Sequence, residues 1–182
     1  MRIISGIYKG RTIHPPKNLP VRPTTDFAKE SLFNILNNYI DFEGLKVLDL
    51  FCGTGNITYE FASRGSVSIT SVDNNYHCCE FVKKTIAALK MQQVKVVKSD
   101  VFSFLNKIVD SYNLIFADPP YNLEPEKFNA IHELVFRNNL LKPGGWLIIE
   151  HGERIDFSKY QYFIEHRKYG NVNFSFFYTE SY

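Results

Sequence analysis

The sequence has 182 residues, of which 45% are hydrophobic and 15% aromatic, and its formal net charge is only +2. A chain of this length predicts one domain, or one domain with a small extension, and its apolar content excludes wholesale disorder. The sequence shows neither a signal peptide nor an apolar run near the ~20 residues of a membrane span, so we expect a soluble, cytoplasmic protein that does not contact a membrane.

The chain opens with a basic segment that predicts an N-terminal arm over residues 1–23. Two short strands are expected around Gly6 and Gly10, and the prolines that follow favour an extended connector. Residues 1–40 hold six Lys or Arg against two Asp or Glu, whereas the remainder of the chain is slightly acidic. This asymmetry is compatible with an arm that contacts nucleic-acid phosphates, and also with an ordinary solvated surface.

From residue 24 to 182 the pattern predicts a single α/β domain. A helix capped by Thr25 or Asp26 comes first, because apolar residues recur at helical spacing up to Tyr39. Short β-branched runs then alternate with helical segments, which is typical of a doubly wound, mostly parallel sheet. The expected strands lie at 46–51, 66–73, 95–100, 113–118 and 146–151, the last after a turn at Pro143-Gly144-Gly145. The expected helices lie at 56–64, 76–90, around 104, and 125–139.

The tail departs from this alternation. Residues 160–170 and 172–180 read as two strands that meet at Gly170-Asn171, which predicts a hairpin and therefore an antiparallel C-terminal strand. The three cysteines and five histidines lack metal-ligand spacing, so we expect free thiols and no metal site.

A glycine-rich turn follows the first strand of the domain. Asp49 precedes a Gly-x-Gly turn, formed by Gly53 and Gly55, that leads into a helix. Such glycines let a ligand approach the backbone closely. A nicotinamide dehydrogenase would be expected to carry a third glycine in this turn, which this chain lacks. Asp49 suits a cationic group on the ligand.

Two further strands end in an acidic residue. Asp73 ends the second strand, where a carboxylate can accept hydrogen bonds from ribose hydroxyls. Asp100 and Val101 follow the third strand, where the carboxylate could accept from an adenine amino group. Asp73 could instead cap a helix, and an aspartate such as Asp100 is common at strand ends.

The fourth strand ends in the sequence Asp118-Pro119-Pro120-Tyr121. Asp118 and a proline carbonyl supply two acceptors, which match the two hydrogens of a planar amino group, and Tyr121 supplies a ring on which a base can stack. This arrangement orients the nitrogen lone pair toward a sulfonium methyl group without a covalent intermediate. The sequence therefore predicts an N-methyltransferase that uses S-adenosyl-L-methionine.

These motifs resemble the class I methyltransferases that modify amino groups. The segments RIISGxxKGR and RPTTD, together with VLDLFCGTGN and DPPY, resemble the bacterial 16S ribosomal RNA guanine-N2 methyltransferases, the RsmD-like family, over nearly the whole chain. The resemblance implies a Rossmann-like fold, S-adenosyl-L-methionine as cofactor, and 16S ribosomal RNA as partner within an assembled or partly assembled small subunit. It also implies an enzyme that acts as a monomer.

The resemblance further implies three groups of site residues. The catalytic group consists of Asp118, Pro119, Pro120 and Tyr121. The cofactor group consists of Asp49, Phe51, Gly53, Gly55, Asp73, Asn74, Asp100, Val101 and Asp118. The RNA-binding group consists of Arg2, Lys9, Arg11, Arg22 and Thr24.

The residues leave other functions open. An amino-group acceptor of this kind also serves adenine in RNA or DNA and the amide of a protein glutamine. A non-catalytic RNA-binding assembly factor could keep the same fold, although the intact Asp118, Asp49 and turn glycines argue against lost chemistry.

Overall fold

A computed structural model describes residues 1–17, 19 and 25–180 of the chain. Within these residues, none of the helices combines the length and the apolar character that crossing a lipid bilayer requires. The helices and strands, in chain order, are α1 (Asp26–Leu36), β1 (Lys46–Leu50), α2 (Asn56–Ser63), β2 (Ser68–Asp73), α3 (Tyr76–Ala88), β3 (Val94–Lys98), α4 (Val101–Lys107), β4 (Tyr112–Ala117), α5 (Pro125–Arg137), β5 (Leu141–His151), β6 (Phe163–Tyr169) and β7 (Val172–Tyr178).

Seven strands form one sheet in the order β3-β2-β1-β4-β5-β7-β6. The first five pair in parallel, with Asp49 opposite Ser71 on β2 and Phe116 on β4. β7 pairs antiparallel with both β5 and β6, which confirms the predicted C-terminal hairpin and its antiparallel strand. The strand order reverses between β1 and β4, and in open α/β sheets ligands bind beyond the carboxyl ends of the strands at this point.

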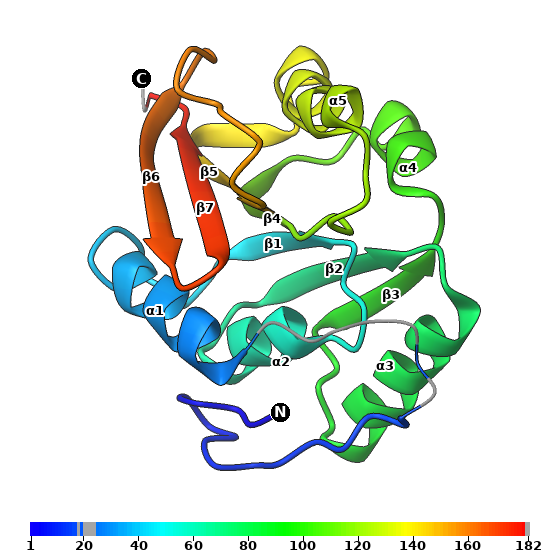
Figure 1. The fold of residues 1–182 in the computed structure, drawn as a ribbon. Coiled ribbons are helices and arrows are strands. Elements are labelled where there is room, and N and C mark those ends of the chain that lie inside the picture. The colour runs from blue at the N-terminus through cyan, green and yellow to red at the C-terminus, as the bar shows by residue number, and fades with distance from the viewer. Residues whose placement is uncertain (18, 20–24, 181–182) are drawn as a thin grey trace.

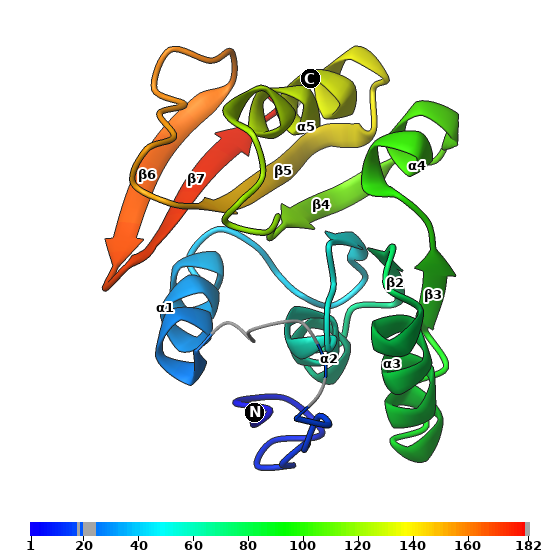
Figure 2. The same ribbon diagram turned by 45° about the vertical axis from the view of Figure 1, so that its right-hand side comes forward.

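Helices cover both faces of the sheet. Helices α1, α2 and α3 lie on one face, and α4 and α5 lie on the other (Figures 1 and 2). Each layer has its own core. Leu32, Phe61 and Val82 pack with one sheet face, whereas Leu105 and Ile131 pack with the opposite face. The strands β1, β2 and β4 are largely buried on both faces, which accounts for their mostly apolar sequences, whereas the edge strand β3 is partly exposed.

Three of the helices begin after a polar residue whose side chain caps the first turn. Thr25 accepts a hydrogen bond from the amide of Ala28, and Asn75 accepts one from the amide of Cys78. Asp100 caps α4 in the same way. These contacts satisfy amide groups that the first turn of a helix leaves without a partner. The expected start of α1 is therefore confirmed.

The strand β5 begins earlier than the sequence indicated. The segment Pro143-Gly144-Gly145 was expected to form a turn before the strand, yet it lies within β5. The amide of Gly144 donates to the carbonyl of Thr179 at 3.0 Å, and the amide of Gly145 donates to its hydroxyl at 2.8 Å. The chain after β7 therefore holds this segment in line with the sheet, while a register shift toward β4 accommodates it.

The N-terminal arm, residues 1–17 of the described chain, forms a hairpin-like loop with an antiparallel bridge between Arg2 and Thr12. The amide of Ile3 donates to the carbonyl of Arg11, and the amide of Ile13 donates to the carbonyl of Met1, both at 2.9 Å. The structure assigns this bridge in place of the two short strands expected here. Ile3 and Ile13 are buried in the same core as α1 and α2, so the arm is packed onto the domain.

Candidate functional site

The candidate site lies at the carboxyl edge of the sheet, where β1, β2 and β4 end side by side. Strand pairing aligns Leu50 with Val72 on one side and with Ala117 on the other. After Leu50 the chain enters the glycine-rich turn, and after Ala117 it enters the Asp-Pro-Pro-Tyr segment. The residue after Val72 is Asp73, which ends β2. The topology therefore brings three of the four predicted motifs to one place.

The glycine-rich turn leaves β1 through an unusual backbone conformation. Phe51 has a φ of 59° and Gly55 a φ of 83°, which is the left-handed region. The amide of Gly55 donates to the carbonyl of Cys52 at 2.8 Å, and this contact closes the turn before α2 begins. A β-carbon added to Gly55 would lie 2.6 Å from the ring of Tyr59. Only glycine meets both requirements, since other residues rarely adopt this conformation and would also clash.

Asp49 lies beneath this turn and is 1% exposed. Its Oδ2 accepts a hydrogen bond from the hydroxyl of Thr58 at 2.5 Å, and that hydroxyl also lies 2.6 Å from Ser71 Oγ. Burial is the main cause that raises the pKa of Asp49 to about 7; the nearby carboxylates of Asp118 and Asp73 contribute to this rise, and the Thr58 contact opposes it. A buried carboxylate that titrates near neutrality and lies next to two others favours a cationic ligand group, which would relieve the repulsion.

Asp73 ties the second strand end to the glycine-rich turn. Its Oδ2 accepts from the amide of Gly53 and its Oδ1 from the amide of Asn75, both at 2.8 Å. The side chain is buried at the end of β2, and its backbone carbonyl accepts from the amide of Ser99 beyond β3. A carboxylate has about four acceptor positions, so these two bonds leave capacity for ligand hydroxyls.

The predicted adenine contacts lie at the third strand end. Asp100 caps α4 through a 2.8 Å bond from the amide of Ser103, and Val101 is buried. Phe51 packs edge-on against Phe102, with the ring centroids 6.3 Å apart. Asn74 is exposed beside Asp73. The capping role of Asp100 was not predicted, whereas the helix-cap alternative for Asp73 is wrong because Asn75 caps α3.

The Asp-Pro-Pro-Tyr segment begins where β4 ends. The amide of Asp118 donates to the carbonyl of Leu50 at 3.3 Å, which places this residue next to the end of β1. Pro119 is buried, and the carbonyl of Pro120 accepts from the amide of Leu123 at 2.9 Å and so closes a turn. Tyr121 is 62% exposed, and its ring is therefore open to a neighbouring molecule.

The predicted RNA-binding residues are distributed along the arm. Arg2, Lys9 and Arg11 are all exposed. Arg22 and Thr24 lie outside the described residues. The carbonyl of Arg2 accepts a hydrogen bond from Lys29 of α1. The amide of Ile7, in the loop before Lys9, donates to the carbonyl of Ser63, the last residue of α2.

Sequence reasoning missed the buried polar cluster that fastens the arm to the domain. Glu60 is fully buried and accepts from the amide of Ile4 at 2.9 Å, from the amide of Ser5 at 3.0 Å and from Arg64 Nε at 2.9 Å. Lys29 Nζ lies 3.7 Å from Glu60 Oε2. A charged residue on the inner side of a helix was the available signal, because buried charges require partners.

The same lysine also reaches the start of α2. Lys29 Nζ donates to Asn56 Oδ1 at 2.7 Å, and Asn56 directly follows the glycine-rich turn. Lys29 is 1% exposed, and burial lowers its pKa while Glu60 and Asp26 oppose that shift. The ammonium group of Lys29 therefore connects the arm, α1 and the residue that follows the glycine-rich turn.

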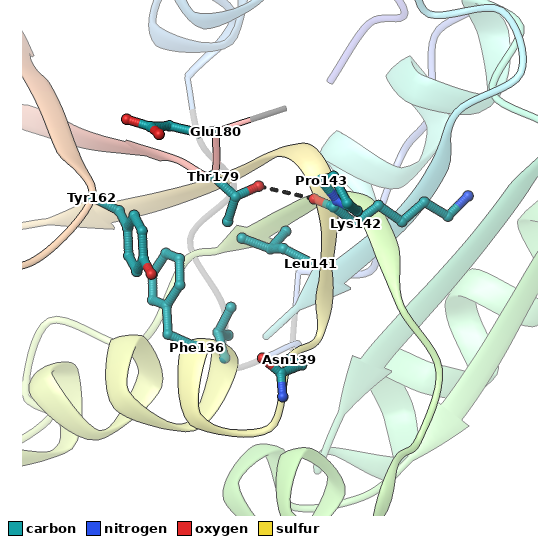
Figure 3. A pocket seen from close by; sticks show the side chains of 9 residues that line it. Phe136, Asn139, Leu141, Lys142, Pro143, Tyr162, Thr179 and Glu180 are labelled. Atoms are coloured by element: carbon teal, nitrogen blue, oxygen red, sulfur yellow. Dashed lines mark hydrogen bonds between the residues drawn. The ribbon is translucent and has the colours of Figure 1, made fainter. Parts of the chain in front are cut away.

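A separate hollow lies at the opposite end of β5. It is lined in part by Lys142 and Pro143 at the beginning of that strand and by Tyr162, whose ring stacks on Phe136 with centroids 4.7 Å apart (Figure 3). The hydroxyl of Thr179 donates to the carbonyl of Lys142 at 2.9 Å. The hollow is thus at the amino edge of the sheet and does not belong to the candidate site.

The family model described as Conserved hypothetical protein 95 matches residues 1–178 of the chain. Ribosomal RNA small subunit methyltransferase D of Escherichia coli is 33% identical over 150 residues, which cover 82% of this chain and 71% of that protein. The protein of the same name from Haemophilus influenzae is 31% identical, and the match covers 82% of this chain and 78% of that protein.

Solved structures share the fold over the full length. The Escherichia coli protein YhhF, described as a candidate methyltransferase, has a TM-score of 0.87 at 27% identity, and the match covers 100% of this chain and 99% of that chain. A Thermus thermophilus protein of undescribed function has a TM-score of 0.84 at 22% identity and covers 99% of each chain.

Proposed function

The chain belongs to the family described as Conserved hypothetical protein 95, as the match over residues 1–178 and the relatives named methyltransferase D establish, and from this premise we propose that it methylates the exocyclic N2 amino group of a guanine in 16S ribosomal RNA. The methyl donor is S-adenosyl-L-methionine. The observation that carries the proposal is the position of Asp118, whose amide bonds to the end of β1 directly before the glycine-rich turn.

The carboxyl edge fits this cofactor chemically. Asp49 would pair with the ammonium group of the methionine moiety, and the backbone at Gly53 and Gly55 allows close approach. Asp73 would accept from the ribose hydroxyls, with Asn74 beside it. Residues 100–101 and Phe51 would border the adenine. When bound, the sulfonium group supplies an activated methyl group.

The acceptor half of the site is formed by the segment after β4. The Asp118 carboxylate and the Pro119 carbonyl would accept the two hydrogens of the guanine amino group and hold its nitrogen toward the cofactor. Pro120 keeps the segment turned, and the exposed ring of Tyr121 would stack on the base. This is catalysis by orientation and electrostatics, and the target base must leave its stack to reach the site.

The arm supplies the contact with the RNA backbone in this proposal. Residues 1–23 would act as an RNA-contact element on the methyltransferase domain of residues 24–182. Exposed Arg2, Lys9 and Arg11 provide positive charge for phosphates, and Arg22 and Thr24 complete the proposed set. The substrate would be an assembled or partly assembled small subunit, and the enzyme would act as a monomer.

The deciding experiment supplies methyl-labelled S-adenosyl-L-methionine to the purified protein together with small subunits from cells that lack it. Mass spectrometry of the digested RNA is expected to show N2-methylguanosine at a single position. Labelled N6-methyladenosine would keep the chemistry and refute the guanine assignment. No labelled RNA, with the cofactor still bound, would direct the search to DNA and to glutamine amides.

The role of Asp118 has its own test. Asp118→Ala is expected to bind S-adenosylhomocysteine within about threefold of the wild type and to lose about a hundred- to a thousandfold in methyl transfer, in the range that removal of a transition-state contact produces. Glu153→Ala is the matched control, since Glu153 is an exposed carboxylate that pairs with Lys168. Turnover near the wild-type rate in Asp118→Ala would refute the acceptor role.

A further inference from the structure

One buried carboxylate at the carboxyl edge has no part in the proposed function so far. Glu150 is the second-last residue of β5 and is only 3% exposed. Its Oε1 accepts a hydrogen bond from the hydroxyl of Tyr121 at 3.3 Å. Tyr121 is the residue proposed to stack on the target base, so this contact joins a buried strand residue to the acceptor site.

The sheet places Glu150 beside the start of the acceptor segment. β4 and β5 pair with Ala117 opposite Ile149, and the next residues along are Asp118 and Glu150. Paired residues of neighbouring strands point to the same face of a sheet. On its other side Glu150 is paired with Phe174 of β7. Its backbone is therefore held within the sheet, between two neighbouring strands.

Tyr121 lies in a very different setting. Its side chain is 62% exposed and comes from the irregular segment between β4 and α5. A β-carbon added to Gly152, just after β5, would lie 3.7 Å from Tyr121 Cδ1, so the ring passes close to the same strand end. An exposed tyrosine with little packing around it populates several rotamers unless a fixed partner selects one.

We infer that Glu150 is a positioning residue for methyl transfer: its carboxylate holds the hydroxyl of Tyr121 and thereby sets the ring as a wall of the acceptor site beside Asp118. The inference rests on the proposed function, because it assigns how that same site receives its base. The anchor is buried and belongs to the sheet, while the anchored ring is largely exposed on the side from which RNA would approach. Glu150 itself need not touch the substrate.

A double-mutant cycle with Tyr121→Phe and Glu150→Ala tests the inference. Single-turnover methylation of saturating small subunits is expected to fall about tenfold in Tyr121→Phe, because the ring remains while its anchor is lost, and a hydrogen bond to a charged group has about this value. Glu150→Ala should cause a similar loss, and the double variant should lose no more than about twofold beyond either single one. S-adenosylhomocysteine affinity should stay within twofold throughout.

Two further variants separate positioning from support of the fold. Glu150→Gln keeps an oxygen that accepts from the tyrosine hydroxyl and should recover most of the rate that Glu150→Ala loses. Glu153→Ala removes an exposed carboxylate three residues away and should leave the rate unchanged. If Glu150→Ala unfolds, Tyr121→Phe still tests the inference, because a wild-type rate in that variant would overturn it and the substitution removes only the hydroxyl of a residue that is 62% exposed.

The outcomes distinguish this inference from the proposed function. A wild-type rate in Tyr121→Phe, or losses that multiply in the double variant, would overturn the inference while RNA methylation by the wild type stood. A Glu150→Gln variant as slow as Glu150→Ala would also overturn it, since the charge rather than the hydrogen bond would then matter. A wild type that methylates no guanine would refute the proposed function first, and the inference with it.

Discussion

Replacing Glu60 with alanine should release the N-terminal arm and lower the stability of the whole domain. Glu60 is fully buried and accepts three hydrogen bonds, from two arm amides and from Arg64, while its charge faces buried Lys29. The variant would leave the lysine ammonium buried with fewer partners. It would also leave the amides of Ile4 and Ser5 without their acceptor.

The size of the loss follows from burial. Removing one partner of a buried ion pair costs about 3–5 kcal/mol, because the remaining charge is left without compensation. Both side chains are at most 1% exposed, so solvent screening reduces this figure little. For a chain of this length each kcal/mol shifts Tm by roughly 2–4 °C. The expected decrease in Tm for Glu60→Ala is therefore about 10 °C.

Thermal unfolding followed by circular dichroism measures this decrease, and amide hydrogen exchange at Ile4 and Ser5 reports release of the arm directly. The matched control is Glu80→Ala, since Glu80 lies on α3 and pairs with Lys83 at the surface. That exposed pair contributes less than about 1 kcal/mol. A Glu60→Ala variant whose Tm lies within 2 °C of the wild type would refute the reasoning.

Three further changes test other parts of the site. Gly55→Ala should bind the cofactor at least tenfold more weakly and lower Tm by several degrees. The control is Gly10→Ala, which has a φ of 81° with open space around it and should show the effect of backbone strain alone. Equal decreases in Tm for the two variants in calorimetry would contradict the clash with Tyr59. Affinity for S-adenosylhomocysteine should rise about tenfold from pH 6 to pH 8, because a pKa of about 7 leaves Asp49 mostly protonated at the lower pH, and a flat titration would exclude this role. Since the raised pKa favours the protonated native state, the unliganded protein should lose stability as pH rises from about 4 toward 7, which denaturant unfolding would detect. Lys9→Ala should lower the slope of log affinity against log salt for RNA by about one, and an unchanged slope would remove that phosphate contact.

Local sequence patterns predicted most of the fold. The alternation of short β-branched runs with helical segments gave the parallel sheet, and Gly170-Asn171 located the C-terminal hairpin. The prediction failed at Pro143-Gly144-Gly145, where turn-forming residues continue a strand because Thr179 bonds to them from more than thirty residues away. A contact over that separation leaves no periodicity in the sequence.

The candidate site divides in the same way. Asp49, Asp73 and Asp118 could be identified because each lies in or directly after the last two residues of an apolar strand, and parallel strands bring their carboxyl ends to one edge. Glu150 lies near the end of the last expected parallel strand, at 146–151, but nothing in the sequence indicates its partner. Its contact with Tyr121 depends on the pairing of β5 with β4 and on the path of the segment after β4.

The buried cluster around Lys29 joins the N-terminal arm to the residue that follows the glycine-rich turn. The ammonium group donates to the carbonyl of Arg2 at 2.6 Å and to Asn56 Oδ1 at 2.7 Å, so it bonds to the arm and to the first residue after the turn at once. In the sequence Asn56 is only the residue that follows the second glycine of the turn. One buried ammonium group is therefore satisfied from both sides, and loss of either contact would leave it with fewer partners in a site that water does not reach.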